Sequence, residues 1–350
     1  MKTQYVYPGS FCPPTYGHLA ILKRAAEFLP EVVVVCSENR DKVDRWFSPE
    51  VCKEMWKTYA LPENVRITTF DEFVRENNVN GANLVMIRGI RGDADLEQEK
   101  KVVAYNSKKF GIDKYLYILS DDEHKDISST KAREVAEGLN LEELARFVSP
   151  LAISALLEKV LDIKNLFMVV GRPGSGKSTF LKMLAEENAV NIHINTDEFN
   201  KKLMPLISKS FPGKDVYGIV LERENELLEV ITSPWLELLK KALRTVPKQT
   251  NVFVEIPYGL EANKSMFQYL GGKVLYVGCE EVETNKRRND ARGTPNIEGF
   301  IEKIPGKEES EIIAKNNGLR LTVINTDGSL DKLSENASLF NRNICEEKLK

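Results

Sequence analysis

Short apolar runs alternate with amphipathic helical patterns along most of the sequence, and this alternation restricts the fold more than any other feature. The run EVVVVCS at residues 31–37 is continuous and β-branched, as in strands that are buried on both faces of a parallel sheet. Before it, GHLAILKRAAEFL has Leu19, Leu22, Ala26 and Leu29 at helical spacing. Strand and helix in turn predict α/β units with doubly wound parallel sheets, whose ligands lie beyond the carboxyl ends of the strands.

The alternation occurs twice, which predicts two domains. A chain of 350 residues is also long for a single hydrophobic core. In the first half, strands are expected at residues 3–9, 31–37, 65–70, 82–89 and 114–120. A helical pattern then ends near Leu161, so the boundary is predicted between residues 161 and 162. In the second half, strands are expected at residues 165–170, 190–195, 250–257, 272–278 and 319–325.

Charge and cysteine content exclude several classes of protein. Forty-nine basic and 52 acidic residues give a net charge of −3, so no overall positive field would gather nucleic acid. The five cysteines are odd in number and lack Cys-x-x-Cys spacing, which argues against a disulfide framework or a zinc site. No apolar run has transmembrane length and no signal peptide is evident, so a cytoplasmic protein without a membrane partner is expected.

The stretch GRPGSGKST, residues 171–179, fits the phosphate-binding pattern G-x-x-x-x-G-K-[ST]. An apolar strand precedes it and a helical pattern follows, as the motif requires. Glycines let backbone N–H groups turn inward on phosphate oxygens, Lys177 supplies charge to the β- and γ-phosphates, and the Ser178 hydroxyl can bind Mg²⁺. The ATP-binding residues predicted here are Gly171, Gly174, Ser175, Gly176, Lys177, Ser178 and Thr179.

Two further stretches in the second half carry charges suited to phosphoryl transfer. Asp197 follows the strand VNIHIN, where a carboxylate can accept a proton from an attacking hydroxyl, help to hold a metal, or cap the next helix. The stretch NKRRNDARGTPN predicts a basic lid that closes on the transferred phosphoryl group. Arg288 and Arg292 lie four residues apart on one helix face and are the candidates for contacting ATP. Lys286 and Arg287 also fit a solvated surface.

The glycine-rich loop, Asp197 after its strand, VFVEIPYGLEAN, the basic lid and VINTDGSLDKL follow one another as in dephospho-coenzyme A kinase. Residues 165–333 are therefore similar to that family. The resemblance implies a P-loop kinase in which Asp197 is the base at the acceptor site and Arg288 stabilises the transferred charge. The chain has NTD at 195–197 where the family has Asp-Ala-Asp, and Ser-Pro at 233–234 where it has His-Pro. It also has IEKIPGKEES in place of the family's glutamine segment. These departures leave the acceptor specificity open.

Three stretches in the first half point to a second phosphate site. GSFCPPTYGH, residues 9–18, puts His18 at a predicted strand-to-helix junction, where unpaired backbone N–H groups favour an anion. ISSTKARE, residues 127–134, places hydroxyls at another helix start, where they can hold the pyrophosphate end of a nucleotide or cap the helix. In IRGIRGDADLEQE, residues 87–99, Arg88 and Arg91 flank the end of a strand, and Glu97 and Glu99 lie on the next helix.

Together these stretches make residues 4 to about 160 resemble bacterial phosphopantetheine adenylyltransferase. The resemblance implies that His18 contacts the α-phosphate of ATP, Arg88 the acceptor, and Arg91 and Glu99 the nucleotide. The residues implied for ATP are Ser10, Phe11, His18, Gly89, Arg91, Glu99, Ser128, Ser129 and Thr130, and those implied for the acceptor are Ser10, Lys42 and Arg88.

Some positions differ from that family's pattern. Ser10 replaces a usual threonine and keeps the hydroxyl, whereas Cys12 stands where aspartate is common. His124 stands where an aromatic residue that stacks on adenine often lies. Arg40 and Arg45 compete with Lys42 for the role at the acceptor.

The two families act on consecutive steps of one pathway, so the resemblances imply a bifunctional coenzyme A synthase. Its Rossmann-like nucleotidyltransferase domain, residues 1–161, would transfer AMP from ATP to 4'-phosphopantetheine. Its kinase domain, residues 162–350, would phosphorylate the ribose 3'-hydroxyl of dephospho-coenzyme A. Mg²⁺ is the expected cofactor, ATP is the co-substrate at both sites, and the adenylyltransferase family's rings of six imply a homo-oligomer. The catalytic residues would be His18, Arg91, Lys177, Asp197 and Arg288.

Two alternatives remain at this point. A nicotinamide mononucleotide adenylyltransferase fused to a ribosylnicotinamide kinase would have the same architecture, although RGIRGDADLEQE argues against it. A regulator that binds nucleotide without turnover is the other, although the intact His18, Lys177 and Ser178 argue against it.

Overall fold

The computed structural model describes residues 3–38, 46–76, 83–256, 268–279, 282–290, 301, 304–327 and 329–346. Contacts within the chain divide it into two units, Met1–Ala152 and Ile153–Lys350. The division falls inside helix α7 (Pro150–Val160), whereas the boundary predicted from the sequence follows the end of that helix. Each unit has its own five-stranded sheet and its own hydrophobic core.

The first sheet is entirely parallel, with strand order β3-β2-β1-β4-β5. Its strands are β1 (Gln4–Gly9), β2 (Val32–Cys36), β3 (Val65–Thr69), β4 (Leu84–Ile90) and β5 (Tyr115–Leu119), which confirms the five predicted runs. The chain moves outward from β1 to β3 and then crosses to β4 and β5, so the order reverses between β1 and β4. Ligands of open α/β sheets bind outside the carboxyl ends of the strands at such a switch point.

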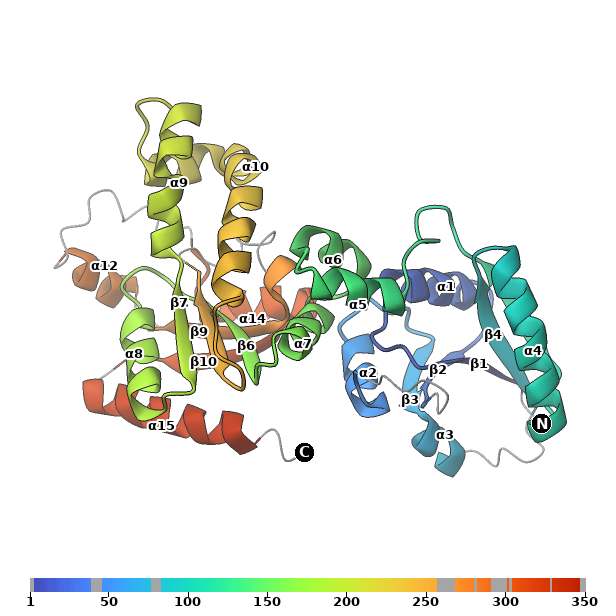
Figure 1. The fold of residues 1–350 in the computed structure, drawn as a ribbon. Helices are drawn as coiled ribbons and strands as arrows, with labels where there is room; N and C mark the ends of the chain where they lie inside the picture. Colours follow the sequence, from blue (N-terminus) through green and yellow to red (C-terminus); the bar gives the residue numbers. More distant parts are fainter. Residues whose placement is uncertain are drawn as a thin grey trace. The chain divides into compact units, whose positions relative to one another are not determined.

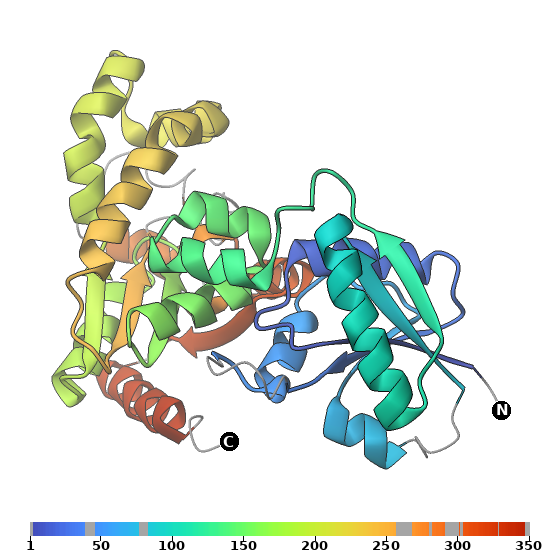
Figure 2. The ribbon, with the colours of Figure 1, turned by 45° about the vertical axis from the view of Figure 1, so that its right-hand side comes forward.

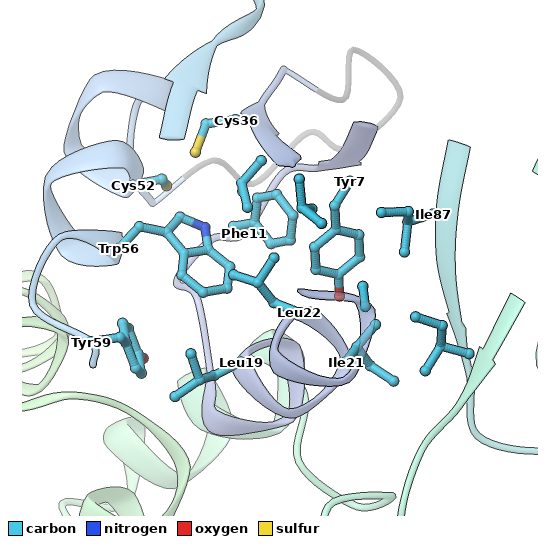
Figure 3. Close-up of a cluster of buried hydrophobic side chains, with 14 of the residues drawn as sticks. Tyr7, Phe11, Leu19, Ile21, Leu22, Cys36, Cys52, Trp56, Tyr59 and Ile87 are labelled. Carbon is cyan, nitrogen blue, oxygen red and sulfur yellow. The ribbon is translucent and has the colours of Figure 1, made fainter. Parts of the chain in front are cut away.

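Helices connect these strands as the hydrophobic periodicity predicts. They are α1 (Tyr16–Ala26), α2 (Pro49–Trp56), α3 (Phe70–Glu76) and α4 (Asp93–Phe110). Figure 2 shows α4 running along the sheet beside β4, which it contacts. Alternate residues of β2 belong to two buried clusters, as expected of a strand covered on both faces. In the larger cluster the Phe11 ring lies between those of Tyr7 and Trp56 (Figure 3).

The helical pattern predicted over residues 128–161 is three helices, α5 (Ser129–Glu137), α6 (Leu141–Phe147) and α7. The first interruption is at Leu139, whose φ of 53° is incompatible with a continuing right-handed helix. The second precedes Pro150, which lacks an N–H and disfavours helical geometry in the residue before it. No helix in the part of the chain that the structure describes is long and apolar enough to span a bilayer.

The second sheet is also parallel, with strand order β10-β9-β6-β8-β7. Its strands are β6 (Asn165–Val170), β7 (Asn191–Asn195), β8 (Asn251–Glu255), β9 (Lys273–Gly278) and β10 (Arg320–Asn325), again as predicted. The strand that leads into the glycine-rich loop, β6, is central and buried throughout. Its helices include α8 (Lys177–Glu187), α9 (Asp197–Ser210), α10 (Val216–Leu243), α12 (Val282–Asp290), α14 (Lys307–Asn316) and α15 (Leu330–Glu346). Figure 1 shows α9 and α10 side by side beyond the end of β7.

Candidate active sites

His18 lies in the first turn of α1, directly after the loop that follows β1 at the switch point of the first sheet. Thr15 is fully buried and is the N-cap of α1. The His18 backbone N–H donates to Thr15 Oγ1 at 3.4 Å, and the Thr15 backbone N–H donates to His18 Nδ1 at 3.1 Å. This is a capping box in which an imidazole takes the place of the usual Glu or Gln side chain.

The capping box sets both the tautomer and the orientation of the His18 ring. Because Nδ1 accepts from a backbone amide, the neutral imidazole carries its proton on Nε2. The ring also meets Phe11 edge-on, with 5.2 Å between centroids. The Phe11 side chain, predicted among the ATP-binding residues, is buried, so it supports the His18 ring from within the core. An N–H donor held in this way suits a phosphate oxygen.

The N-termini of α1 and α5 approach each other closely. A Cβ added to Gly17 would lie 2.8 Å from the carbonyl oxygen of Ile127, so the first turn of α1 needs a glycine there. Ser129 Oγ donates to the carbonyl of Pro13 at 2.7 Å. The structure therefore brings together two of the stretches that the sequence points to, the loop before His18 and residues 127–130.

The other residues predicted around this site vary in exposure. Ser128 is the N-cap of α5, and with Thr130 it lines an open depression of about 610 Å³. Ser10 is half-buried in the loop after β1. The candidates for the acceptor at positions 40, 42 and 45 lie outside the described residues.

Arg88, in β4, forms a two-pronged ion pair with Glu99 of α4. The guanidinium donates to the carboxylate through Nε at 2.8 Å and through Nη2 at 2.5 Å. Burial alone would lower the pKa of Arg88, but the hydrogen bonds and charge of Glu99 outweigh it and raise the pKa. The resemblance implied that Arg88 binds the acceptor and Glu99 the nucleotide. Their pairing was missed because the sequence pattern does not show how α4 packs against β4. Arg91 follows the same strand and is exposed.

Gly89 lies between the two arginines and faces α1. A Cβ at this position would be 3.0 Å from Cγ1 of Ile21, which is closer than ordinary contact. The glycine therefore lets α1 pack closely against β4. Gly89 therefore has a packing role, and its predicted role in binding ATP stays a prediction.

We expect Glu99→Ala to lower the free energy of unfolding of the first unit by about 2–4 kcal/mol, because it leaves the partly buried Arg88 without its counter-charge. Urea denaturation would measure this effect. The control is Glu97→Ala, which removes an exposed ion pair with Lys100 and should change stability by less than about 0.5 kcal/mol. Equal effects of the two substitutions would show that the Arg88–Glu99 pair does not stabilise the unit.

In the second unit, the loop after β6 has the backbone geometry of a phosphate cradle. Gly171, Gly174 and Gly176 all have positive φ, at 150°, 76° and 92°. A Cβ on Gly171 would lie 2.0 Å from the carbonyl oxygen of Val277, so no other residue fits there. Among the described residues, the buried Ser175 hydroxyl has no hydrogen-bond partner. These features fit a loop whose polar groups are completed by a phosphate.

The side chain of Lys177 lies within this loop. Lys177 is buried, and its Nζ donates to the carbonyls of Gly171 at 2.9 Å and Arg172 at 3.2 Å. The next residue, Ser178, donates from Oγ to Glu255 Oε1 at 3.1 Å. Thr179 is half-buried in the same first turn of α8.

Glu255, at the carboxyl end of β8, is a site residue that the sequence prediction missed. Its carboxylate is 2.8 Å from Nε2 of His193, and its side chain also accepts from Ser178. Burial alone would raise the pKa of Glu255, but the His193 hydrogen bond and the Lys177 charge outweigh it and lower the pKa. An acidic residue directly after the apolar run VFV of β8 was the signal that could have identified it.

Asp197 and Arg288 lie at different edges of this site. Asp197 is the exposed first residue of α9. The N-cap of α9 is Thr196, whose hydroxyl donates to the Glu255 carbonyl at 2.6 Å. Arg288 of α12 donates to the carbonyls of Gly174 at 3.3 Å and Thr326 at 3.2 Å. The predicted partner of Arg288, at position 292, lies outside the described residues.

Hydroxyl and carboxylate oxygens are ligands that suit Mg²⁺, and Ser178 and Glu255 bring both beside the loop. Among the residues that the structure describes, no three His, Cys, Asp or Glu side chains gather as a metal site of their own. Mg²⁺ commonly takes one or two protein oxygens together with the phosphates of its nucleotide. The residues present therefore fit a cation that arrives with ATP.

Comparison with known proteins identifies the first unit. Residues 6–135 match the cytidylyltransferase-like family. Phosphopantetheine adenylyltransferase of Aquifex aeolicus is 33% identical over 163 residues, which are 45% of this chain and 97% of the relative. The enzyme of that name from Leptospira biflexa is 33% identical over 141 residues, covering 39% of this chain and 85% of the relative.

Solved structures give a more distant likeness. A crystal structure described as NadR protein in complex with NR is 14% identical, covers 97% of this chain and 95% of its own, and has a TM-score of 0.34. A nicotinic acid mononucleotide adenylyltransferase of Plasmodium falciparum is 18% identical over 45% of this chain and 96% of its own, with a TM-score of 0.34. The relatives from Aquifex and Leptospira confirm the family resemblance of the first half, and that of the second half stays a prediction. Through its N-terminal part, the chain belongs to the phosphopantetheine adenylyltransferase family of cytidylyltransferase-like proteins.

Proposed function

We propose that the first unit transfers an adenylyl group from ATP to 4'-phosphopantetheine, forming dephospho-coenzyme A and pyrophosphate. The names of the curated relatives support this substrate. The observation that carries the proposal is the capping box, which directs Nδ1 of His18 to the backbone and leaves the proton on Nε2. That donor, at the switch point of the sheet, suits the charge that develops on the α-phosphate.

The chemistry needs no general base in the protein. A phosphate oxygen of the acceptor is already anionic, so it attacks the α-phosphorus as the bond to the leaving pyrophosphate breaks. The protein must hold two anions in line and offset their repulsion. His18 donates to the α-phosphate, and the N-termini of α1 and α5 direct their unpaired N–H groups and partial positive charge to the phosphates.

Arg88 is the proposed cation on the acceptor side, and Glu99 holds its guanidinium in one orientation through two hydrogen bonds. Such two-point contact fixes a planar guanidinium better than a single bond would. Ser10 would bind the acceptor phosphate and Arg91 the nucleotide. Ser128 and Thr130, at the start of α5, would lie along the triphosphate.

For the second unit we propose that a second ATP phosphorylates the ribose 3'-hydroxyl of dephospho-coenzyme A. Lys177 would leave the loop carbonyls and bind the β- and γ-phosphates, as the lysine of this motif does. Asp197 is the proposed base for the attacking hydroxyl, and Arg288 would stabilise charge on the transferred group. Ser178 and Glu255 would hold Mg²⁺, which neutralises charge on the β- and γ-phosphates when it is bound.

Both activities are tested by giving the purified chain Mg-ATP with either phosphopantetheine or nicotinamide mononucleotide. We expect pyrophosphate release only with phosphopantetheine, and mass spectrometry should detect dephospho-coenzyme A followed by coenzyme A. Release only with nicotinamide mononucleotide would overturn the assignment of the first unit. ATP binding without turnover of either compound would favour a nucleotide-sensing regulator.

A further inference from the structure

The loop between β1 and α1, residues 10–15, leads to His18 and is called the His18 loop below. It is held by side chains at three consecutive carbonyl groups. Cys12, Pro13 and Pro14 precede the N-cap of α1, and the two prolines have no N–H to donate. Backbone carbonyls that are removed from water need hydrogen-bond partners, so partners must come from elsewhere. The Cys12 carbonyl accepts from Arg133 Nη1 at 2.6 Å, the Pro13 carbonyl from Ser129 Oγ at 2.7 Å, and the Pro14 carbonyl from the Tyr59 hydroxyl at 2.8 Å.

Two of these three donors come from α5, the helix that begins with the predicted phosphate-binding hydroxyls. Arg133 and Ser129 lie four residues apart, and therefore on the same face of that helix. Their bonds tie α5 to the loop before α1 over one helical turn. The relative position of His18 and the hydroxyls of residues 128–130 thus depends on this face of α5.

The Arg133 guanidinium contacts three segments of the site. Its Nη1 binds the Cys12 carbonyl, and its Nη2 donates to Thr130 Oγ1 at 3.3 Å. The guanidinium carbon also lies over the Trp46 ring, 5.9 Å from its centroid. Trp46 directly follows residues 39–45, which contain the candidate cations for the acceptor. One rigid fork therefore contacts the His18 loop, the start of α5 and the Trp46 ring.

The charge of Arg133 also favours this role. In the part of the chain that the structure describes, Arg133 forms no ion pair with a carboxylate, so its hydrogen bonds go to neutral oxygens. A charged donor makes a stronger bond to a carbonyl than a neutral one does. Its positive charge also lies beside Thr130, one of the residues assigned to the triphosphate.

We propose that Arg133 is a positioning residue for adenylyl transfer, which holds the His18 loop in register with the hydroxyls at the start of α5. This inference rests on the proposed function of the first unit. Misplacing a group by about 1 Å can cost roughly a hundredfold in rate, so a loosened loop should reduce kcat more than it raises KM.

The test compares Arg133→Met and Arg133→Lys with the wild type by amide hydrogen exchange and by steady-state kinetics. In Arg133→Met, the peptide covering residues 10–19 should exchange at least about threefold faster. Its kcat for pyrophosphate release should fall roughly 10- to 100-fold, with KM for ATP and phosphopantetheine within about threefold. Arg133→Lys keeps the charge but replaces the planar fork with a single ammonium group, so both effects should be intermediate. Arg146→Met, on the exposed surface of α6, is the matched control and should match the wild type in both measurements.

Unchanged exchange and kinetics in Arg133→Met would overturn the proposal. A loss of kcat without faster exchange of residues 10–19 would also overturn it, because Arg133 would then act on the substrates directly. If Arg133→Met does not fold, Arg133→Lys alone provides the same comparison. Failure of the wild type to release pyrophosphate would overturn the proposed function instead, and the exchange measurement would still test whether Arg133 holds the loop.

Discussion

Replacing His18 by alanine should lower the rate of pyrophosphate release by about a hundredfold to a thousandfold, the usual cost of losing one donor to developing charge. The imidazole presents Nε2–H from a ring that Thr15 and Phe11 hold in place, and alanine has no donor to replace it. Because the first reaction supplies the second, coenzyme A formation from phosphopantetheine should fall in parallel. Initial rates of pyrophosphate release and mass spectrometry of the products would measure both effects.

Two controls separate the chemistry of His18 from its role in the helix cap. Adding dephospho-coenzyme A directly should restore coenzyme A formation by the His18→Ala protein, because the second unit is unaltered. Lys23→Ala, an exposed change in the last turn of α1, should leave pyrophosphate release within about twofold of the wild type. A His18→Ala protein that releases pyrophosphate as fast as Lys23→Ala would remove His18 from the reaction.

The strands were predictable because burial on both faces leaves a continuous apolar signature. Every residue of β2 is buried, and the run of four valines before Cys36 predicts this from composition alone. The helix α4 begins and ends where its periodic pattern does, and the left-handed Gly111 terminates it. The positive φ of Leu139 was not predictable in this way, since leucine rarely adopts it. The interruption itself has a local signal, because Gly138 and Asn140, on either side of Leu139, are residue types that end and begin helices.

The sequence predicted the motifs of the candidate sites but not the hydrogen bonds and ion pairs that join their residues. A capping box with an imidazole does not follow the S/T-x-x-E/Q pattern, so the hydrogen bond from Thr15 to His18 is evident only in the structure. The pairs Arg88–Glu99 and Ser178–Glu255 join residues on elements that are separate in sequence. The sequence indicates which strand ends carry polar groups, whereas the sheet order decides which of them meet.

Both units place polar groups at the same kind of position, a strand-to-helix turn at the carboxyl edge of a parallel sheet. The turns nevertheless use different chemistry. After β1, the backbone carbonyls of residues 12–14 accept hydrogen bonds from side chains of α5 and from the Tyr59 hydroxyl. After β6, three glycines with positive φ let the backbone itself form the cradle. The first turn therefore depends on distant side chains for its shape, whereas the second depends mainly on its own residues.

Replacing Lys177 by alanine should abolish phosphorylation of dephospho-coenzyme A, with a loss of at least about a hundredfold, because the charge that would bind the β- and γ-phosphates is removed. Lys177 is buried and lies within the loop that its own hydrogen bonds help to shape, so an exposed lysine cannot replace it. Given phosphopantetheine and ATP, this protein should release pyrophosphate at the wild-type rate and accumulate dephospho-coenzyme A. Lys182→Ala, an exposed change on the same helix, should still complete the synthesis. Coenzyme A formation by Lys177→Ala at the rate of Lys182→Ala would mean that the second unit is not the kinase that its loop suggests.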